Sequence, residues 1–145
     1  MSARNFFTSD QQKAIQQAIA YAELNTSGEV RVHIDEKCKG DVLDCAANQF
    51  KRMDMHKTKL SNGVLFYLAV ADQKFAILGD KGINEKVPGD FWDTIRDEML
   101  QHFKKQQFTE GLCKGIEMAG EKLKLHFPYK DDDINELSDE VSFGK

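Results

Sequence analysis

The chain has 145 residues, of which 30% are charged and 41% are hydrophobic, and its net charge is −4 at pH 7. These proportions are typical of a single soluble globular domain, and no apolar run approaches the roughly 20 residues that a membrane-spanning helix needs. The acidity is concentrated in residues 131–145, which carry six acidic residues and one lysine. The nearly neutral remainder lacks the basic face that nucleic-acid binding requires.

Three cysteines, Cys38, Cys45 and Cys113, occur without a C-x-x-C spacing. Their odd number and their spacing argue against a zinc ribbon and against a disulfide framework. We therefore expect free, mostly buried thiols in a reducing compartment. The first residues, MSARNFFTSDQQ, contain no apolar segment of the kind that a secretory signal needs. Together these features predict a cytoplasmic protein.

The first third of the chain predicts a helix followed by a strand. A capping box of Ser9 and Gln12 precedes alanine and isoleucine residues at helical spacing, which predicts a helix over residues 10–24. Residues 29–35 alternate between apolar and polar side chains. This alternation is typical of a half-buried strand, and it predicts that His33 points outward.

The middle of the chain predicts a second helix and a hairpin. The helix is expected to begin at Gly40-Asp41, because an apolar stripe follows and reaches Met53. Residues 64–71 contain no charge, which favours a central strand covered on both faces. Residues 72–74 are expected to turn the chain, and residues 75–78 to return antiparallel.

The last third predicts two helices. Asp90 stands where an N-cap belongs, and Thr109 is expected to cap the next helix, which Pro128 ends. The order of elements predicts a single α/β domain over residues 1–130, with a mixed sheet flanked by helices. Residues 131–145 follow as an acidic tail that we expect to be solvated, so that its deletion would cost little stability.

The predicted topology brings polar residues to one edge of the sheet. The first two strands are joined through a helix and are therefore parallel, whereas the third returns antiparallel. The starts of the first two strands and the end of the third then share an edge, to which the following loop can fold back. This edge collects four candidate metal ligands, Glu29, Asn62, Asp80 and Asp90, and four candidate neighbours in a binding site, Thr58, Gly63, Gly79 and Gly82.

Oxygen donors without a converging histidine or cysteine suit a hard cation such as Ca²⁺ or Mg²⁺. Each residue has an ordinary structural explanation when taken alone: Gly79 to Gly82 form a turn, Asp90 caps a helix and Glu29 begins a strand. Their convergence is therefore what favours a cation site.

The opposite edge of the sheet offers a competing site. It carries Asp35, Glu36 and Asp72. Ligands of open α/β sheets commonly bind at the carboxyl ends of parallel strands, which favours this edge. It lacks the glycines that permit close backbone approach, and we rank it second.

Several segments, taken in order, resemble the TPM domain family. They are T-S-G-E-V-R-V-H-I (26–34), K-T-K-L-S-N-G-V-L-F-Y-L-A (57–69), F-A-I-L-G-D-K-G-I (75–83), V-P-G-D-F-W (87–92), F-T-E-G-L (108–112) and H-F-P-Y-K-D-D-D-I-N-E-L-S-D-E-V-S-F-G (126–144). The family includes thylakoid-lumen phosphatase-like proteins, photosystem II repair proteins and a nematode receptor modulator, and this chain is most similar to its small stand-alone bacterial members. The resemblance implies an α/β sandwich, divalent-cation binding as in some members, and acid phosphatase activity as in plant members.

Known phosphatase signatures restrict how such activity could arise. The chain has no C-x₅-R loop and no G-x-x-x-x-G-K-[ST] loop. Asp131-x-Asp133 follows Pro128 rather than a buried strand, and the same acidic stretch lacks the glycine and the final glutamate of an EF-hand. Metal-assisted hydrolysis remains, with Asp80 and Glu29 as ligands, Asp90 as a base, and Arg31 or Lys81 as the only nearby phosphate contacts.

We therefore expect a TPM-domain protein that binds a divalent cation, Ca²⁺ or Mg²⁺, at a strand-end cleft and serves as a binding or accessory module. The first alternative is a weak metal-dependent acid phosphatase acting on phosphomonoesters. The second is a protein-interaction module that uses the acidic tail. The sequence predicts neither nucleic-acid binding nor membrane insertion.

Overall fold

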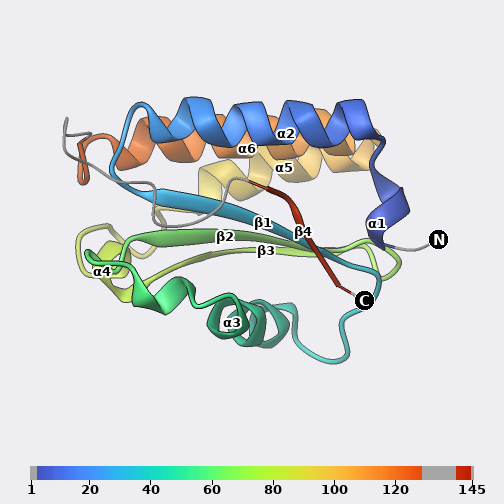
Figure 1. Ribbon diagram of the computed structural model, residues 1–145, viewed down its shortest axis with the longest axis horizontal. Helices are drawn as coiled ribbons and strands as arrows, with labels where there is room; N and C mark the ends of the chain where they lie inside the picture. The colour runs from blue at the N-terminus through green and yellow to red at the C-terminus, as the bar shows by residue number, and fades with distance from the viewer. Residues whose placement is uncertain (1–2, 129–139, 145) are drawn as a thin grey trace.

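Most of the charge-free segment forms β2 (Gly63–Ala69), all of whose residues are buried, and the strand ends two residues before the segment does. A computed structural model describes residues 3–128 and 140–144. It places β2 inside a four-stranded sheet of order β3-β2-β1-β4 (Figure 1). β1 (Glu29–Asp35) pairs with β2 in parallel, and β3 (Lys74–Gly79) pairs with it antiparallel. The prediction of an interior strand bonded on both sides is confirmed.

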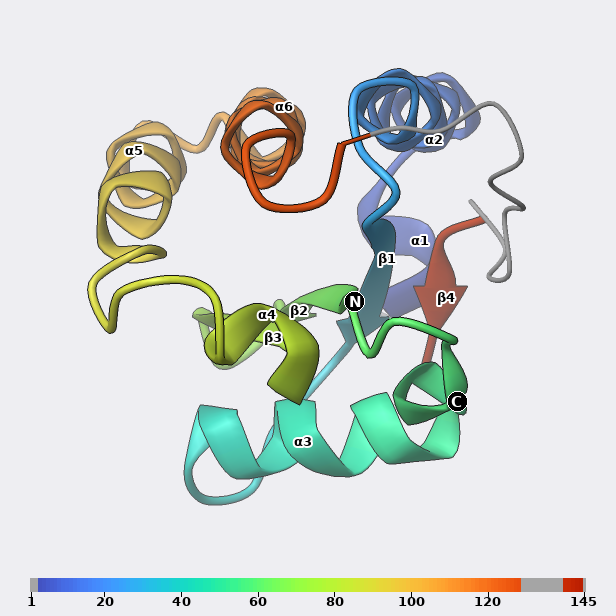
Figure 2. The same cartoon turned by 90° about the vertical axis from the view of Figure 1, so that its left-hand side faces the viewer.

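Alternate side chains of β2 enter two separate cores. Val64, Phe66 and Leu68 belong to the larger core, whereas Leu65, Tyr67 and Ala69 belong to the smaller one. Figure 2 shows α2 (Ser9–Glu23), α5 (Asp93–Lys104) and α6 (Phe108–Leu123) over one face of the sheet and α3 (Val42–Arg52) beneath the other.

Three short helices complete the fold. They are α1 (Ala3–Phe6), the 3-10 turn η1 (Met55–Lys57) before β2, and α4 (Lys81–Asn84) directly after β3. Among the residues that the structure describes, no helix is long and apolar enough to cross a membrane.

Three predicted helix caps are wrong. The capping box of α2 uses Thr8 and Gln11, one residue earlier than the predicted pair Ser9 and Gln12. Asp90 does not cap α5. Its backbone carbonyl accepts a hydrogen bond from the Asp93 amide. Phe91 is buried and Trp92 packs against Gly79, and these contacts keep the chain in a turn until Asp93.

The helix α6 likewise begins before its predicted cap. Its N-cap position is Gln107, and Thr109 lies inside the first turn. The preceding residue, Gln106, has a left-handed backbone with φ of 61°, which ends α5 and lets α6 begin two residues earlier than the sequence indicates.

The end of the chain forms an unpredicted strand. β4 (Ser142–Phe143) pairs in parallel with His33 and Ile34 of β1, which Figure 1 shows as the red segment beside β1. Val141 is only 8% exposed and belongs to the larger core. The expectation of a solvated tail is therefore wrong for residues 141–143, whereas residues 131–139, with most of the acidic side chains, lie outside the described part of the chain.

Replacing Val141 should measure how firmly this last strand is held. Val141→Ala removes buried methyl groups and should lower the free energy of unfolding by about 1–3 kcal/mol, as measured by urea denaturation. Leu125→Ala is the control, because Leu125 is 83% exposed, and it should change stability by less than about 0.5 kcal/mol. Equal effects of the two variants would show that the strand is not docked.

Candidate functional site

The register of the sheet confirms which strand ends meet. Glu29 lies opposite Gly63, and Val64 lies opposite Gly79. The starts of β1 and β2 and the end of β3 therefore share one edge, as the sequence predicts, and α4 lies beside it (Figure 1). We call it the strand-end edge.

Three of the predicted site residues with polar side chains are buried parts of this edge. The Glu29 amide donates to the Asn62 carbonyl at 3.2 Å, and the Asn62 side-chain amide donates to the Ser27 carbonyl at 3.1 Å. The Asn62 backbone amide donates to the Thr58 hydroxyl at 3.3 Å. Glu29, Asn62 and Thr58 are 4%, 2% and 6% exposed. These bonds hold the loop before β2 against the loop before β1, which gives Thr58 and Asn62 an architectural role.

Asp80 differs from these residues because one of its two carboxylate oxygens accepts no hydrogen bond from the described residues. Its amide donates to the Gly63 carbonyl at 2.9 Å, and its Oδ1 accepts from the Lys81 amide at 2.8 Å, which caps α4. Its Oδ2 is buried and has no hydrogen-bond partner among the described residues. Such an atom needs an explanation, because an unpaired buried polar oxygen is destabilising.

Backbone carbonyls of the neighbouring loop lie close to Gly82, two residues after Asp80. A Cβ on Gly82 would be 2.5 Å from the Ser61 carbonyl oxygen and would also clash with that of Leu60. Only glycine permits this approach of α4 to the loop. Ser61 itself has a left-handed backbone with φ of 51°. Carbonyl oxygens of the loop before β2 thus lie against α4, the helix that Asp80 caps.

The four predicted metal ligands do not form one coordination group. Within residues 3–128 and 140–144, no three histidine, cysteine, aspartate or glutamate side chains are grouped so that they could hold a metal ion. Asp90 is exposed in the turn before α5. Whether a cation binds at this edge stays a prediction.

A pocket of about 560 Å³ opens on the strand-end edge. Its charged lining residues are Lys59, Lys81, Lys86, Glu85 and, when protonated, His126. The Lys86 ammonium also lies 4.5 Å from the centre of the Phe127 ring. The pocket is therefore basic, which suits an anion. Of these residues, only Lys81 was predicted from the sequence as a phosphate contact, because the others come from loops that lie far apart along the chain.

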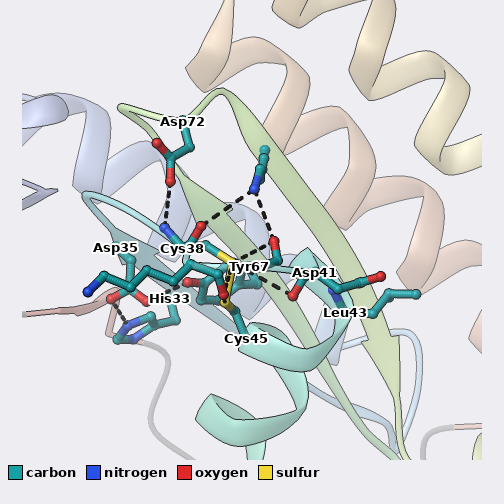
Figure 3. The surroundings of a disulfide bond; sticks show 11 residues. His33, Asp35, Cys38, Asp41, Leu43, Cys45, Tyr67 and Asp72 are labelled. Carbon is teal, nitrogen blue, oxygen red and sulfur yellow. Dashed lines mark hydrogen bonds and ion pairs between the residues drawn. A yellow bond between two sulfur atoms is a disulfide. The ribbon is translucent and has the colours of Figure 1, made fainter.

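At the opposite edge, two of the three competing carboxylates, those of Asp35 and Asp72, are engaged in structural hydrogen bonds. Asp72 Oδ2 accepts from the Cys38 amide at 2.8 Å, which ties the β2–β3 turn to the loop after β1. Asp35 accepts from the Tyr67 hydroxyl at 2.5 Å and contacts His33 at 2.7 Å (Figure 3). These partners account for both carboxylates without a metal.

The expectation of free thiols is wrong for two of the cysteines. Cys38 and Cys45 form a disulfide, with Cα atoms 6.2 Å apart, while Cys113 is free (Figure 3). The turn at Gly40-Asp41 reverses the chain between β1 and α3, so that residues seven apart in sequence face each other. Disulfides are typical of oxidising compartments, and this bond removes the thiol argument for the cytoplasm.

The prediction that His33 points outward is also wrong. His33 is 3% exposed, because its side chain lies on the face of the sheet that carries the smaller core and stacks there on Tyr67. Its Nδ1 lies 2.9 Å from the Ser142 hydroxyl and its Nε2 lies 2.7 Å from Asp35 Oδ1. The ring also stacks on Tyr67, with ring centres 5.9 Å apart. The polar residues at alternate positions of β1 were the available signal. They mark side chains that enter the smaller core with hydrogen-bond partners, and not side chains exposed to solvent.

Burial sets the protonation of this group. It lowers the pKa of His33 from its ordinary value of 6.5, and the charges of Arg31 and Arg52 act in the same direction, while Asp35 opposes them only in part. Burial and the Asp35 carboxylate together raise the pKa of Tyr67. The imidazole of His33 and the hydroxyl of Tyr67 are therefore both uncharged at neutral pH.

A four-stranded mixed sheet with three helices on one face and one on the other defines a small α/β sandwich domain. The chain belongs to the TPM domain family, whose sequence profile matches residues 2–122. No curated protein matches the chain.

Three solved structures are similar over most of their length. The BA42 protein from the psychrophilic bacterium Bizionia argentinensis is 50% identical, with 97% of each chain covered and a TM-score of 0.92. The N-terminal domain of a protein from P. gingivalis is 17% identical, with 87% of this chain and 83% of that chain covered and a TM-score of 0.70. The N-terminal domain of the cg2496 protein from Corynebacterium glutamicum is 13% identical, with 97% and 81% covered and a TM-score of 0.65. The last two share the fold alone.

The lowered pKa of His33 predicts a loss of stability in mild acid. The folded protein binds fewer protons than the unfolded chain between the folded pKa of His33 and 6.5. The contribution of His33 to the free energy of unfolding is therefore complete above pH 6.5, and it is lost as pH falls from 6.5 towards the pKa of His33 in the folded protein. Urea unfolding over a pH series should show this slope in the wild type and a flatter one in His33→Gln, which cannot titrate.

His56→Gln is the matched control, because His56 is exposed on η1. It should retain the wild-type slope. An unchanged slope in His33→Gln would show that other groups cause the acid sensitivity.

Proposed function

We propose that this TPM-domain protein binds a divalent cation, Ca²⁺ or Mg²⁺, at the strand-end edge and serves as a binding module. Asp80 is the ligand on which the site depends. The observation that carries this proposal is the buried Asp80 Oδ2, which has no hydrogen-bond partner among the described residues.

With no partner among the described residues, Asp80 Oδ2 lowers the stability of the folded protein. A buried carboxylate oxygen without a partner costs about 1–3 kcal/mol or more, which a bound cation would offset. We propose as further ligands the Leu60 and Ser61 carbonyl oxygens, which lie against Gly82, two residues after Asp80. Carboxylate and carbonyl oxygens are the ligands that Ca²⁺ and Mg²⁺ accept. With one carboxylate central and water completing the coordination shell, the expected dissociation constant is on the order of 10⁻⁴–10⁻³ M.

Substitution of Asp80 tests the site directly. Asp80→Asn keeps a side-chain oxygen that can cap α4 but removes the charge, and it should weaken Ca²⁺ binding about tenfold or more, as measured by amide chemical shifts during titration. In the wild type, saturating Ca²⁺ should also raise the melting temperature by mass action.

Asp72→Asn is the matched control, because Asp72 lies at the opposite edge and its replacement can still accept from the Cys38 amide. It should bind Ca²⁺ like the wild type. The proposal fails if Asp72→Asn abolishes binding while Asp80→Asn leaves it intact, or if the wild type binds no divalent ion at millimolar concentration.

A second candidate function is hydrolysis of phosphomonoesters at the same edge. The observation that favours it is the basic pocket with Lys59, Lys81 and Lys86. Lysine ammonium groups attract a phosphate, and their charge opposes a cation that binds alone. A bound divalent cation would supply Lewis-acid polarisation of the phosphoryl oxygen. The lysines of this chain would orient the phosphate and neutralise its charge.

This arrangement predicts that a cation and a phosphomonoester bind cooperatively. Phenyl phosphate should raise the Mg²⁺ affinity of the wild type about fivefold or more, and Mg²⁺ should raise that of phenyl phosphate by the same factor. Lys81→Gln and Lys86→Gln should reduce the coupling, whereas Lys105→Gln, outside the pocket, should not. Equal Mg²⁺ affinity with and without phenyl phosphate would contradict this candidate while leaving cation binding intact.

A further inference from the structure

A second pocket lies at the opposite end of β3, on the face that carries three helices. Its volume is about 300 Å³. Four phenylalanines from four different elements form its wall, namely Phe6 of α1, Phe75 of β3, Phe103 of α5 and Phe108 of α6. Neither the cation proposal nor the hydrolysis candidate uses this pocket.

The phenylalanine rings that form the wall of this pocket pack against one another. The rings of Phe6 and Phe108 meet edge to face at 5.2 Å, and those of Phe75 and Phe103 at 4.9 Å. Phe103 and Phe108 lie 5.6 Å apart. All four rings remain partly exposed. Preformed, mostly apolar concavities with a few polar groups at the rim are typical of small-molecule sites.

The rim is positively charged. Its charged lining residues are Lys74 and Lys104, and no described aspartate or glutamate lines the pocket. Lys74 donates to the Gly40 carbonyl at 3.0 Å. Lys104 makes no ion pair with any described carboxylate. The ammonium of Lys104 is thus available to an anionic ligand, at a site whose apolar wall would shield the pair from water.

Two rim residues adopt a backbone conformation that favours glycine. Gln73 in the β2–β3 turn and Gln106 between α5 and α6 have φ of 54° and 61°. A turn alone would be served better by glycine or asparagine. A long amide side chain at both strained positions, each lining the same pocket, is consistent with a polar contact to a ligand.

We propose that this pocket binds a small amphipathic acid, with a carboxylate at Lys104 and an alkyl or single-ring body against the phenylalanines. A neutral ligand would leave the Lys104 charge uncompensated, and the two lysines would repel a cationic one. The volume is at the lower limit of ligand pockets, which restricts the body to a short chain or one ring.

A charge series of probes tests this proposal on the full chain. Octanoate, octan-1-ol and octylammonium share the same apolar body and differ in head group. Octanoate should cause saturable amide shifts in residues 68–75 and 100–108, and it should bind about threefold more tightly than octan-1-ol. Octylammonium should bind most weakly. Shifts that are confined to the strand-end edge, or equal affinity for all three probes, would overturn the proposal.

Two adjacent lysines provide a matched pair of variants. Lys104 lines the pocket and Lys105 does not, although both are exposed at the end of α5. Both variants change the net charge equally, so a difference between them reports the position of the lysine. Lys104→Glu should weaken octanoate binding about fivefold, and Lys105→Glu less than about twofold. Equal losses would mean that octanoate responds only to overall charge, and the proposal would be wrong.

Discussion

The structure depends on the burial of one strand from both sides. β2 is covered on each face and paired on each edge, so every side chain and every backbone group of this strand is removed from water. Because the side chains alternate, burial of the whole strand requires two cores, and the two cores require helices on both faces of the sheet. This constraint also determines where polar groups can be placed. They collect at the two ends of the sheet, where the strands stop, or they enter the smaller core with hydrogen-bond partners, as His33 does.

Much of this architecture could be predicted from the sequence because its signals are local. The alternation in β1, the charge-free run of β2 and the apolar stripes of the helices each lie within one element, and the strand pairing followed from their order. The elements that were missed depend on distant contacts. β4 has only two residues, and its partner His33 is 109 residues away from Ser142. Asp90 fails as a cap because Trp92 packs against Gly79, a contact that no local pattern contains.

The candidate site divides in the same way. Topology alone was enough to bring Glu29, Asn62 and Asp80 to one edge, since the ends of three strands must meet there. It was not enough to assign their roles. Asn62 and Thr58 hold loops together, whereas Asp80 keeps a buried oxygen without a partner among the described residues. The charge of the adjoining pocket was equally inaccessible, because Lys59, Lys86 and His126 are scattered in the sequence and gather only when the loops are in place.

The bond between Cys38 and Cys45 makes the connection between β1 and α3 sensitive to the chemistry of its surroundings. The two residues are seven apart in sequence, and closing a loop of this size removes enough conformational freedom from the unfolded chain to stabilise the fold by about 2.5 kcal/mol. In a domain of this length that corresponds to roughly 8–10 °C in melting temperature. Where thiols are kept reduced, this bond is absent, and the same sequence should unfold at a correspondingly lower temperature.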